Sequence, residues 1–210
     1  MISHLHLDHA GGLRAARRRT FAFAAGALEP PGVPAHVPTR MHHPRADIAV
    51  TTSPRVIGPG MAMPPPLPRM LSWRGNGTEQ APAVNVRRLG LVMISGCRHP
   101  PTEQTLRVTE QVPGIPIQAM AGGLHLPAHP AGTPLIPQAA PGNPHPPRQP
   151  ISERDTEHAL EQIHARGPRV IALPGHDSTP STHATFSRHL ADRYHTPRTG
   201  QQLRITAMGS

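Results

Sequence analysis

The first ten residues contain a dense group of side chains that can bind metal ions. His4, His6, Asp8 and His9 form the pattern H-x-H-x-D-H. Imidazole nitrogens and carboxylate oxygens are ligands of zinc and related divalent metals. In an extended segment His4 and His6 project to the same side, whereas the next two donors come as the chain turns. The pattern therefore predicts one metal at the first two histidines and a second at the Asp8-His9 pair. A histidine-rich surface loop is the other interpretation, in a chain with 16 histidines, and it accounts poorly for this spacing.

Three later segments each carry a histidine after or within a short apolar stretch. They are Leu89–Pro100 with His99, Ala121–Leu126 with His125, and Leu173–Ser178 with His176. In this order, and together with the first motif, they resemble the metallo-β-lactamase-fold metallohydrolase superfamily. The resemblance is nearest to the branch that includes the dihydropterin-ribofuranosyl-aminobenzene-phosphate synthases, and it runs patchily from residue 2 to about 206.

This resemblance implies an α/β fold, the metallo-β-lactamase-like αββα sandwich, and a metal-dependent hydrolase. Such an enzyme acts on a small substrate, with anionic compounds among the candidates, through a metal-activated water. The cofactor implied is zinc, as one or two ions, with iron or manganese as alternatives. Asp8 would be a ligand and would also orient the nucleophilic water. The implied ligands are His4, His6 and His99 for one ion, and Asp8, His9 and His176 for the other.

One ligand of the resembled family has no candidate here. Many members carry a bridging Asp after the third histidine ligand, but no Asp lies between residues 48 and 154. His125 stands nearest to that place in the order of motifs, and it is a metal ligand, a substrate contact or a core histidine. Without the bridging carboxylate, a single metal or a weakly held second one also fits the sequence.

Three further residues have open alternatives. Arg69 lies in a Pro-Arg pair before Glu79-Gln80, as in the resembled branch, so its guanidinium could bind an anionic substrate group; the alternative is an ordinary surface arginine. Asp177 either orients an imidazole or caps the next helix. Cys97 is either a sulfur ligand or, as we expect, a small buried residue at a strand end.

The chain begins only three residues before His4, whereas the resembled family has several strands before this motif. We therefore expect a single domain over residues 1–210 that is N-terminally incomplete, with its first strands missing and Pro-rich insertions near 58–70 and 127–150. Missing strands would expose a sheet edge and apolar surface. The alternative to an active hydrolase is accordingly a catalytically impaired, truncated metal-binding remnant of such an enzyme.

Apolar periodicity, prolines and capping residues predict alternating strands and helices, above all in the second half of the chain. Ser152 with Asp155 resembles a capping box at the start of a helix. The stretches 60–69 and 127–150 are rich in proline, and we expect them to be irregular loops. Strands are expected at 1–2, 33–37, 48–50, 55–57, 83–86, 89–95, 115–120, 170–173 and 203–206, and helices at 13–19, 101–111, 152–166 and 179–194.

The composition favours one domain and argues against other classes of function. A chain of 210 residues can bury a sizeable core, although only 36% of them are hydrophobic and 29 are prolines. The net charge is +9, but the basic residues are scattered arginines, and single Trp and Tyr residues offer no stacking platform for bases. A nucleic-acid-processing relative is therefore a weaker alternative than a small-molecule enzyme.

Location follows from what the sequence lacks. No apolar run approaches the ~20 residues of a membrane span. One cysteine excludes an internal disulfide framework. We therefore expect a cytoplasmic protein without a membrane partner, and the sequence does not indicate its oligomeric state.

Overall fold

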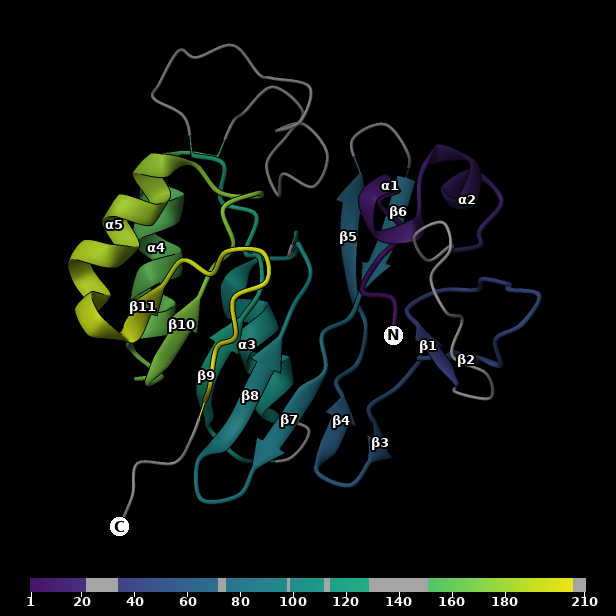
Figure 1. Ribbon diagram of the computed structural model, residues 1–210, viewed down its shortest axis with the longest axis horizontal. Coiled ribbons are helices and arrows are strands. Elements are labelled where there is room, and N and C mark those ends of the chain that lie inside the picture. Colours follow the sequence, from purple (N-terminus) through teal and green to yellow (C-terminus); the bar gives the residue numbers. More distant parts are fainter. Residues whose placement is uncertain (22–33, 72–74, 98, 112–113, 129–150, 206–210) are drawn as a thin grey trace.

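A seven-stranded sheet forms the centre of the protein, seen here in a computed structural model (Figure 1). The structure describes residues 1–21, 34–71, 75–97, 99–111, 114–128 and 151–205, without the side chains of residues 7–8, 69–71 and 75–76. The strand order is β11-β10-β9-β8-β7-β4-β3. In chain order these strands are β3 Arg55–Gly58, β4 Met61–Met63, β7 Ala83–Val86, β8 Gly90–Ile94, β9 Ile117–Ala121, β10 Val170–Ala172 and β11 Tyr194–His195.

The two halves of this sheet differ in strand direction. Strands β8 to β11 are parallel, and each connection between them contains a helix, as parallel strands require. Strands β3, β4, β7 and β8 are antiparallel neighbours. The parallel half therefore places the loops that follow β8, β9 and β10 at one edge of the sheet, which is where ligands bind in α/β folds.

Three helices cover one face of the parallel half. They are α3 Thr102–Gln111, α4 Glu153–His164 and α5 Pro180–Leu190. Leu91 and Met93 of β8 face Leu106, Ile163 and Phe186 of these helices in the main hydrophobic core. Each fully buried side chain of this kind contributes roughly 1.5–3 kcal/mol. None of the helices in the described ranges is long and apolar enough to cross a membrane.

The start of α4 follows local sequence rules. The Ser152 hydroxyl accepts from the Asp155 N–H, and the Asp155 carboxylate accepts from the Ser152 N–H at 2.7 Å. This reciprocal pair is the predicted capping box, which satisfies two donors that a helix start leaves exposed.

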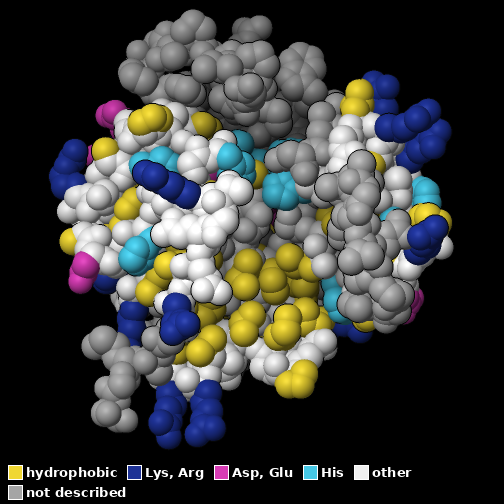
Figure 2. Space-filling model, in the orientation of Figure 1, with side chains coloured by type: hydrophobic (Ala, Val, Ile, Leu, Met, Phe, Trp, Pro, Cys, Tyr) yellow, Lys and Arg dark blue, Asp and Glu magenta, His cyan; other side chains and the backbone are white. Residues whose placement is uncertain are grey.

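The opposite face of the sheet carries a smaller apolar cluster. Leu89, Val92 and Ala119 are buried there, with Ile205 among the partly buried residues beside them. Figure 2 shows hydrophobic side chains lining a hollow over the β7 and β8 region. Mixed helices and strands confirm the predicted α/β class. The complete αββα sandwich and the missing first strands stay predictions.

The N-terminal part lies beside this sheet and contains short elements (Figure 1). Residues Met1–Ile2 do not form the strand that we predicted there. The Ile2 N–H nevertheless donates to the His36 carbonyl at 3.0 Å, and the Ser3 carbonyl accepts from the Gln80 N–H at 3.0 Å. Backbone partners on both sides therefore hold the segment that leads to His4. The short elements are α1 Leu7–Ala10, α2 Leu13–Arg17, the parallel pair β1 Ala35–Val37 and β2 Ile48–Val50, and the antiparallel pair β5 Leu67–Leu71 and β6 Gly75–Glu79.

Three further predictions about local structure were also wrong. The expected loop at 60–69 contains β4 and the first part of β5, because Met61–Met63 pairs with both β3 and β7, and only Pro64 to Pro66 interrupt the pairing. The strand expected at 203–206 is absent through Ile205, since β11 occupies that edge of the sheet. The helix expected to reach residue 194 ends at Leu190, where Ala191 has a φ of 49°. Residues 129–150 and 206 lie outside the described part.

Candidate metal centre

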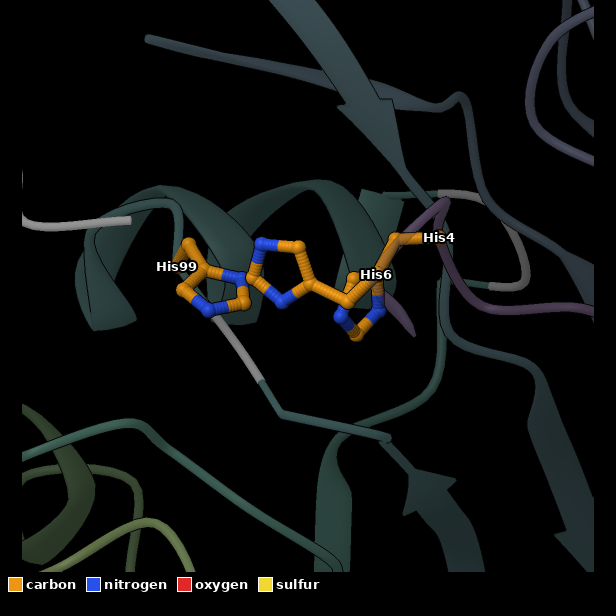
Figure 3. Close-up of side chains that lie close together, drawn as sticks. All are labelled: His4, His6 and His99. Carbon is orange, nitrogen blue, oxygen red and sulfur yellow. The ribbon is translucent and has the colours of Figure 1, made fainter. Parts of the chain in front are cut away.

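Three of the predicted metal ligands lie together. His4 and His6 come from the extended segment before α1, and His99 comes from the loop between β8 and α3 (Figure 3). One ring nitrogen of each lies within 4.8 Å of the others. The ring centroid of His6 lies 4.6 Å from that of His4 and 4.5 Å from that of His99. His4 and His99 are buried, at 0% and 4% exposure, so these rings are held in place by the fold.

A second group of donors lies next to the first. His9 of α1, Cys97 after β8 and His176 after β10 also have ligand atoms within 4.8 Å of one another. Sγ of Cys97 is 3.4 Å from Nε2 of His9 and 2.9 Å from Nε2 of His176. The ring of His9 is 4.2 Å from that of His4, which joins the two groups. The structure thus brings His9 and His176 together as predicted, and the side chain of Asp8 lies outside the described part.

The carboxylate of Glu79, at the end of β6, contacts both the backbone and the ring of His99. Its Oε2 accepts a hydrogen bond from the His99 backbone N–H at 3.1 Å, and its Oε1 contacts Nδ1 of the same ring. Both side chains are 1% exposed. A carboxylate beside one ring nitrogen orients the imidazole and directs the other nitrogen toward a metal. Sequence reasoning missed this role, because no local pattern links Glu79 to a histidine 20 residues later.

Ser3 and Gly96 set the spacing between the two groups. The Ser3 hydroxyl lies 3.0 Å from Nδ1 of His4 and 3.4 Å from Nδ1 of His9. A hydroxyl donates one proton and accepts others, so it can serve both rings at once. A Cβ at Gly96 would come within 2.5 Å of Ser3 Oγ and 3.0 Å of His9 Cε1. Only glycine at this position therefore lets the Ser3 side chain and the His9 ring approach the turn after β8.

His125 lies on the far side of His99 and is held through its backbone. Its ring centroid is 4.3 Å from that of His99, and its φ of 48° is a left-handed conformation uncommon for a side-chain-bearing residue. The buried carboxylate of Asp177 accepts from the His125 N–H at 3.0 Å. Asp177 does not cap α5, because Thr179 is the N-cap residue. A Cβ at Gly123 would fall 1.8 Å from Asp177 Oδ2, so a glycine is needed for this contact.

A cleft opens beside His99 and His125. Its apolar walls include Leu124, Leu126 and Ile151, and two carboxylates, those of Glu103 and Asp155, also line it. Arg69, the predicted contact for an anionic substrate group, lies in β5, and its side chain is outside the described part.

Burial shifts the pKa of three groups outside the two clusters. It lowers the pKa of His36, which the nearby Arg55 and N-terminal charges lower further. It lowers the pKa of His183, although the charge of Asp177 partly opposes this. It also raises the pKa of the Tyr194 phenol. His36 is therefore favoured as a neutral residue of β1.

The donors fit a divalent transition metal. Three imidazoles in the first group match catalytic zinc sites, which keep one position open for water or substrate. Imidazole and sulfur donors in the second group favour zinc over magnesium or manganese. The metal identity stays a prediction.

Comparisons with known proteins support the fold. No family model matches the chain, and no curated protein matches it. A crystal structure of a metal-dependent hydrolase of the β-lactamase superfamily is similar, with a TM-score of 0.55 and 17% sequence identity, over 77% of this chain and 60% of that chain. The chain thus spans about 60% of the length of that hydrolase. At this identity the similarity shows the fold alone, and the predicted synthase branch stays a prediction. The chain is therefore similar in fold to a metal-dependent hydrolase of the β-lactamase superfamily.

Proposed function

We propose that the chain is a metal-dependent hydrolase that acts on a small-molecule substrate. The observation that carries this proposal is the convergence of His4, His6 and His99, which are far apart in the sequence and whose ligand atoms lie within 4.8 Å of one another. A set of three imidazoles, two of them buried, is unusual for a purely structural role, because catalytic zinc sites use three protein ligands where structural ones use four. The similar crystal structure is that of a metal-dependent hydrolase.

The proposed ligands form two adjacent metal positions. The first metal position is held by His4, His6 and His99, and the second by His9, His176 and, as the sequence predicts, Asp8. A divalent cation held there would polarise a substrate carbonyl or phosphoryl oxygen and lower the pKa of a water molecule. Glu79 keeps His99 oriented, and we propose that Asp8 also orients the attacking water.

The cleft beside His99 supports a substrate with an apolar portion. Leu124, Leu126 and Ile151 would contact that portion. Glu103 and Asp155 lie in the same cleft, so a negatively charged group placed there would meet like charges. We therefore propose that an anionic group of the substrate, where there is one, lies at the metal side of the cleft and near His125, whose ring is 4.3 Å from that of His99.

Metal-dependent turnover by the purified chain tests this function. Phosphodiester and lactone substrates are assayed after chelation and after zinc is restored. We expect activity only with metal, and a loss of at least about 100-fold in His6→Ala, because removing even an outer partner of a ligand costs 10–100-fold. His189→Ala removes an exposed histidine on α5 and should keep full activity. Equal activities of His6→Ala and the unchanged chain would reject the proposal.

A metal-binding remnant without catalysis is the second candidate. The chain spans about 60% of the similar hydrolase, so parts of that enzyme have no counterpart in the alignment. Zinc binding that depends on His6, together with no turnover of any substrate tested, would favour this candidate over the hydrolase.

A further inference from the structure

Cys97 lies between two histidines that come from distant parts of the chain. Its sulfur is 3.4 Å from Nε2 of His9, which precedes it by 88 residues, and 2.9 Å from Nε2 of His176, which follows it by 79. The Cys97 side chain is buried, with 6% exposure, whereas His176 is exposed. The sulfur therefore forms the buried base of this group, and an ion could reach it from the side of His176.

The orientation of the His9 ring is set from its other side. The Ser3 hydroxyl contacts Nδ1 of His9 at 3.4 Å, so Nε2 points to the sulfur. The absence of a Cβ at Gly96 allows this approach, because such an atom would lie 3.0 Å from the His9 ring. The ring and the thiol thus face each other because of a hydrogen bond and a glycine, which hold them in this geometry.

The spacing agrees with ligands of one ion. Tetrahedral zinc with bonds of roughly 2.3 Å to sulfur and 2.0–2.1 Å to nitrogen separates those two atoms by about 3.5 Å. The Cys97–His9 separation of 3.4 Å matches this value, and the Cys97–His176 separation of 2.9 Å is shorter. A small movement of the exposed His176 side chain would open the second separation.

We propose that Cys97 is a thiolate ligand of the second metal position, together with His9 and His176. This inference rests on the proposed function, because it requires that the chain binds metal. When the ion binds, the thiol loses its proton to solvent and a sulfur–metal bond forms, as at other cysteine metal sites. The thiolate supplies a negative charge in a chain that has no Asp between residues 48 and 154 to act as a bridging ligand.

Cobalt(II) binding tests this ligand directly. A thiolate bound to Co²⁺ produces an intense near-ultraviolet charge-transfer band, which imidazole and carboxylate ligands do not produce. Cys97 is the single cysteine of the chain, so such a band can come from no other residue. We expect the unchanged chain to show the band when saturated with Co²⁺, and Cys97→Ser to lose it completely while keeping the weaker visible bands of the first position.

Two histidine variants locate the sulfur ligand. In His176→Ala the band should be lost or should require a higher Co²⁺ concentration, whereas in His6→Ala, which alters the first position, it should persist. A band that disappears in His6→Ala but is unchanged in His176→Ala would overturn the assignment, because it would place Cys97 at the other ion.

The outcomes for the unchanged chain separate this inference from the proposed function. Bound Co²⁺ with visible bands but no charge-transfer band overturns the role of Cys97 and leaves the histidine site intact. A folded chain that binds no Co²⁺ refutes the proposed function and this inference together. Neither measurement depends on whether the Cys97→Ser variant folds, and circular dichroism checks the folding of each variant.

Discussion

Replacing Glu79 should weaken metal binding although this residue is not itself a proposed ligand. Its carboxylate accepts from the His99 backbone N–H at 3.1 Å and contacts Nδ1 of the ring, and both side chains are 1% exposed. When Nδ1 of His99 carries the ring proton, it donates to this carboxylate, which accepts. The lone pair on Nε2 is then the one available to a cation.

Glu79→Gln keeps the size of the side chain and changes only its hydrogen-bonding pattern. An amide has one acceptor oxygen and a donor nitrogen, so it cannot accept from the backbone N–H and from Nδ1 with separate atoms. We expect zinc affinity at the His4–His6–His99 position to fall about 10–100-fold, as for other partners of metal-bound histidines. This corresponds to roughly 1.4–2.8 kcal/mol of binding free energy. Glu79→Ala removes both acceptors and should also lower the free energy of unfolding by about 1–3 kcal/mol for each lost buried partner.

A competition titration with a chromophoric chelator measures the zinc dissociation constant of each variant. Glu157→Gln, which changes an exposed carboxylate on α4, is the matched control and should leave the constant unchanged. Thermal melting of the metal-free proteins separates a folding defect from a binding defect. A Glu79→Gln variant that is fully folded and binds zinc as tightly as the unchanged chain would refute the role of the carboxylate.

Three further measurements test the fold and its link to metal binding. Gly123→Ala places a Cβ 1.8 Å from Asp177 Oδ2 and should lower the free energy of unfolding in urea by about 1–3 kcal/mol. In the control Gly175→Ala the new Cβ meets no atom within 4 Å, so the free energy of unfolding should change by less than about 0.5 kcal/mol. Equal effects of the two substitutions would contradict this packing. Because burial lowers the pKa of His183, the unfolded chain binds more protons at this residue than the folded chain does. The stability that the neutral His183 side chain contributes is therefore complete above the unfolded pKa of about 6.5 and is lost as the pH falls through the pKa of the folded chain. His183→Gln should reduce this acid-side decrease in melting temperature, and an unchanged pH profile would count against it. Zinc at 100 times its dissociation constant should raise the free energy of unfolding by about 2.7 kcal/mol, if it binds the folded chain and not the unfolded one. A thermal-shift assay that shows no change in melting temperature would contradict such selective binding.

Local rules predicted many of the regular elements. Strand β8 was expected because its residues are continuously apolar, and Leu91, Val92 and Met93 are indeed buried. Helix α4 was expected from the capping pair Ser152 and Asp155, which forms as predicted. These signals involve residues close in sequence, so they can be recognised without knowing the rest of the fold.

Elements that depend on distant partners were missed. Strand β4 follows Gly60 and precedes three prolines, so it looks like a loop by composition. It forms because Met61 and Ala62 pair with Val84 and Ala83 of β7. A strand of three residues forms its hydrogen bonds with the neighbouring strands of the sheet. The sequence of these three residues does not indicate that such partner strands exist.

The candidate site shows the same division. The sequence by itself determined which residues could bind metal, because the H-x-H-x-D-H spacing and the position of His99 after an apolar strand are local features. Only the tertiary structure decided that Glu79 orients His99, and that the sulfur of Cys97 lies within 3.4 Å of His9 rather than merely filling space. Both contacts arise where separate strands and turns meet, so they depend on the packing of the whole sheet, which no short stretch of sequence encodes.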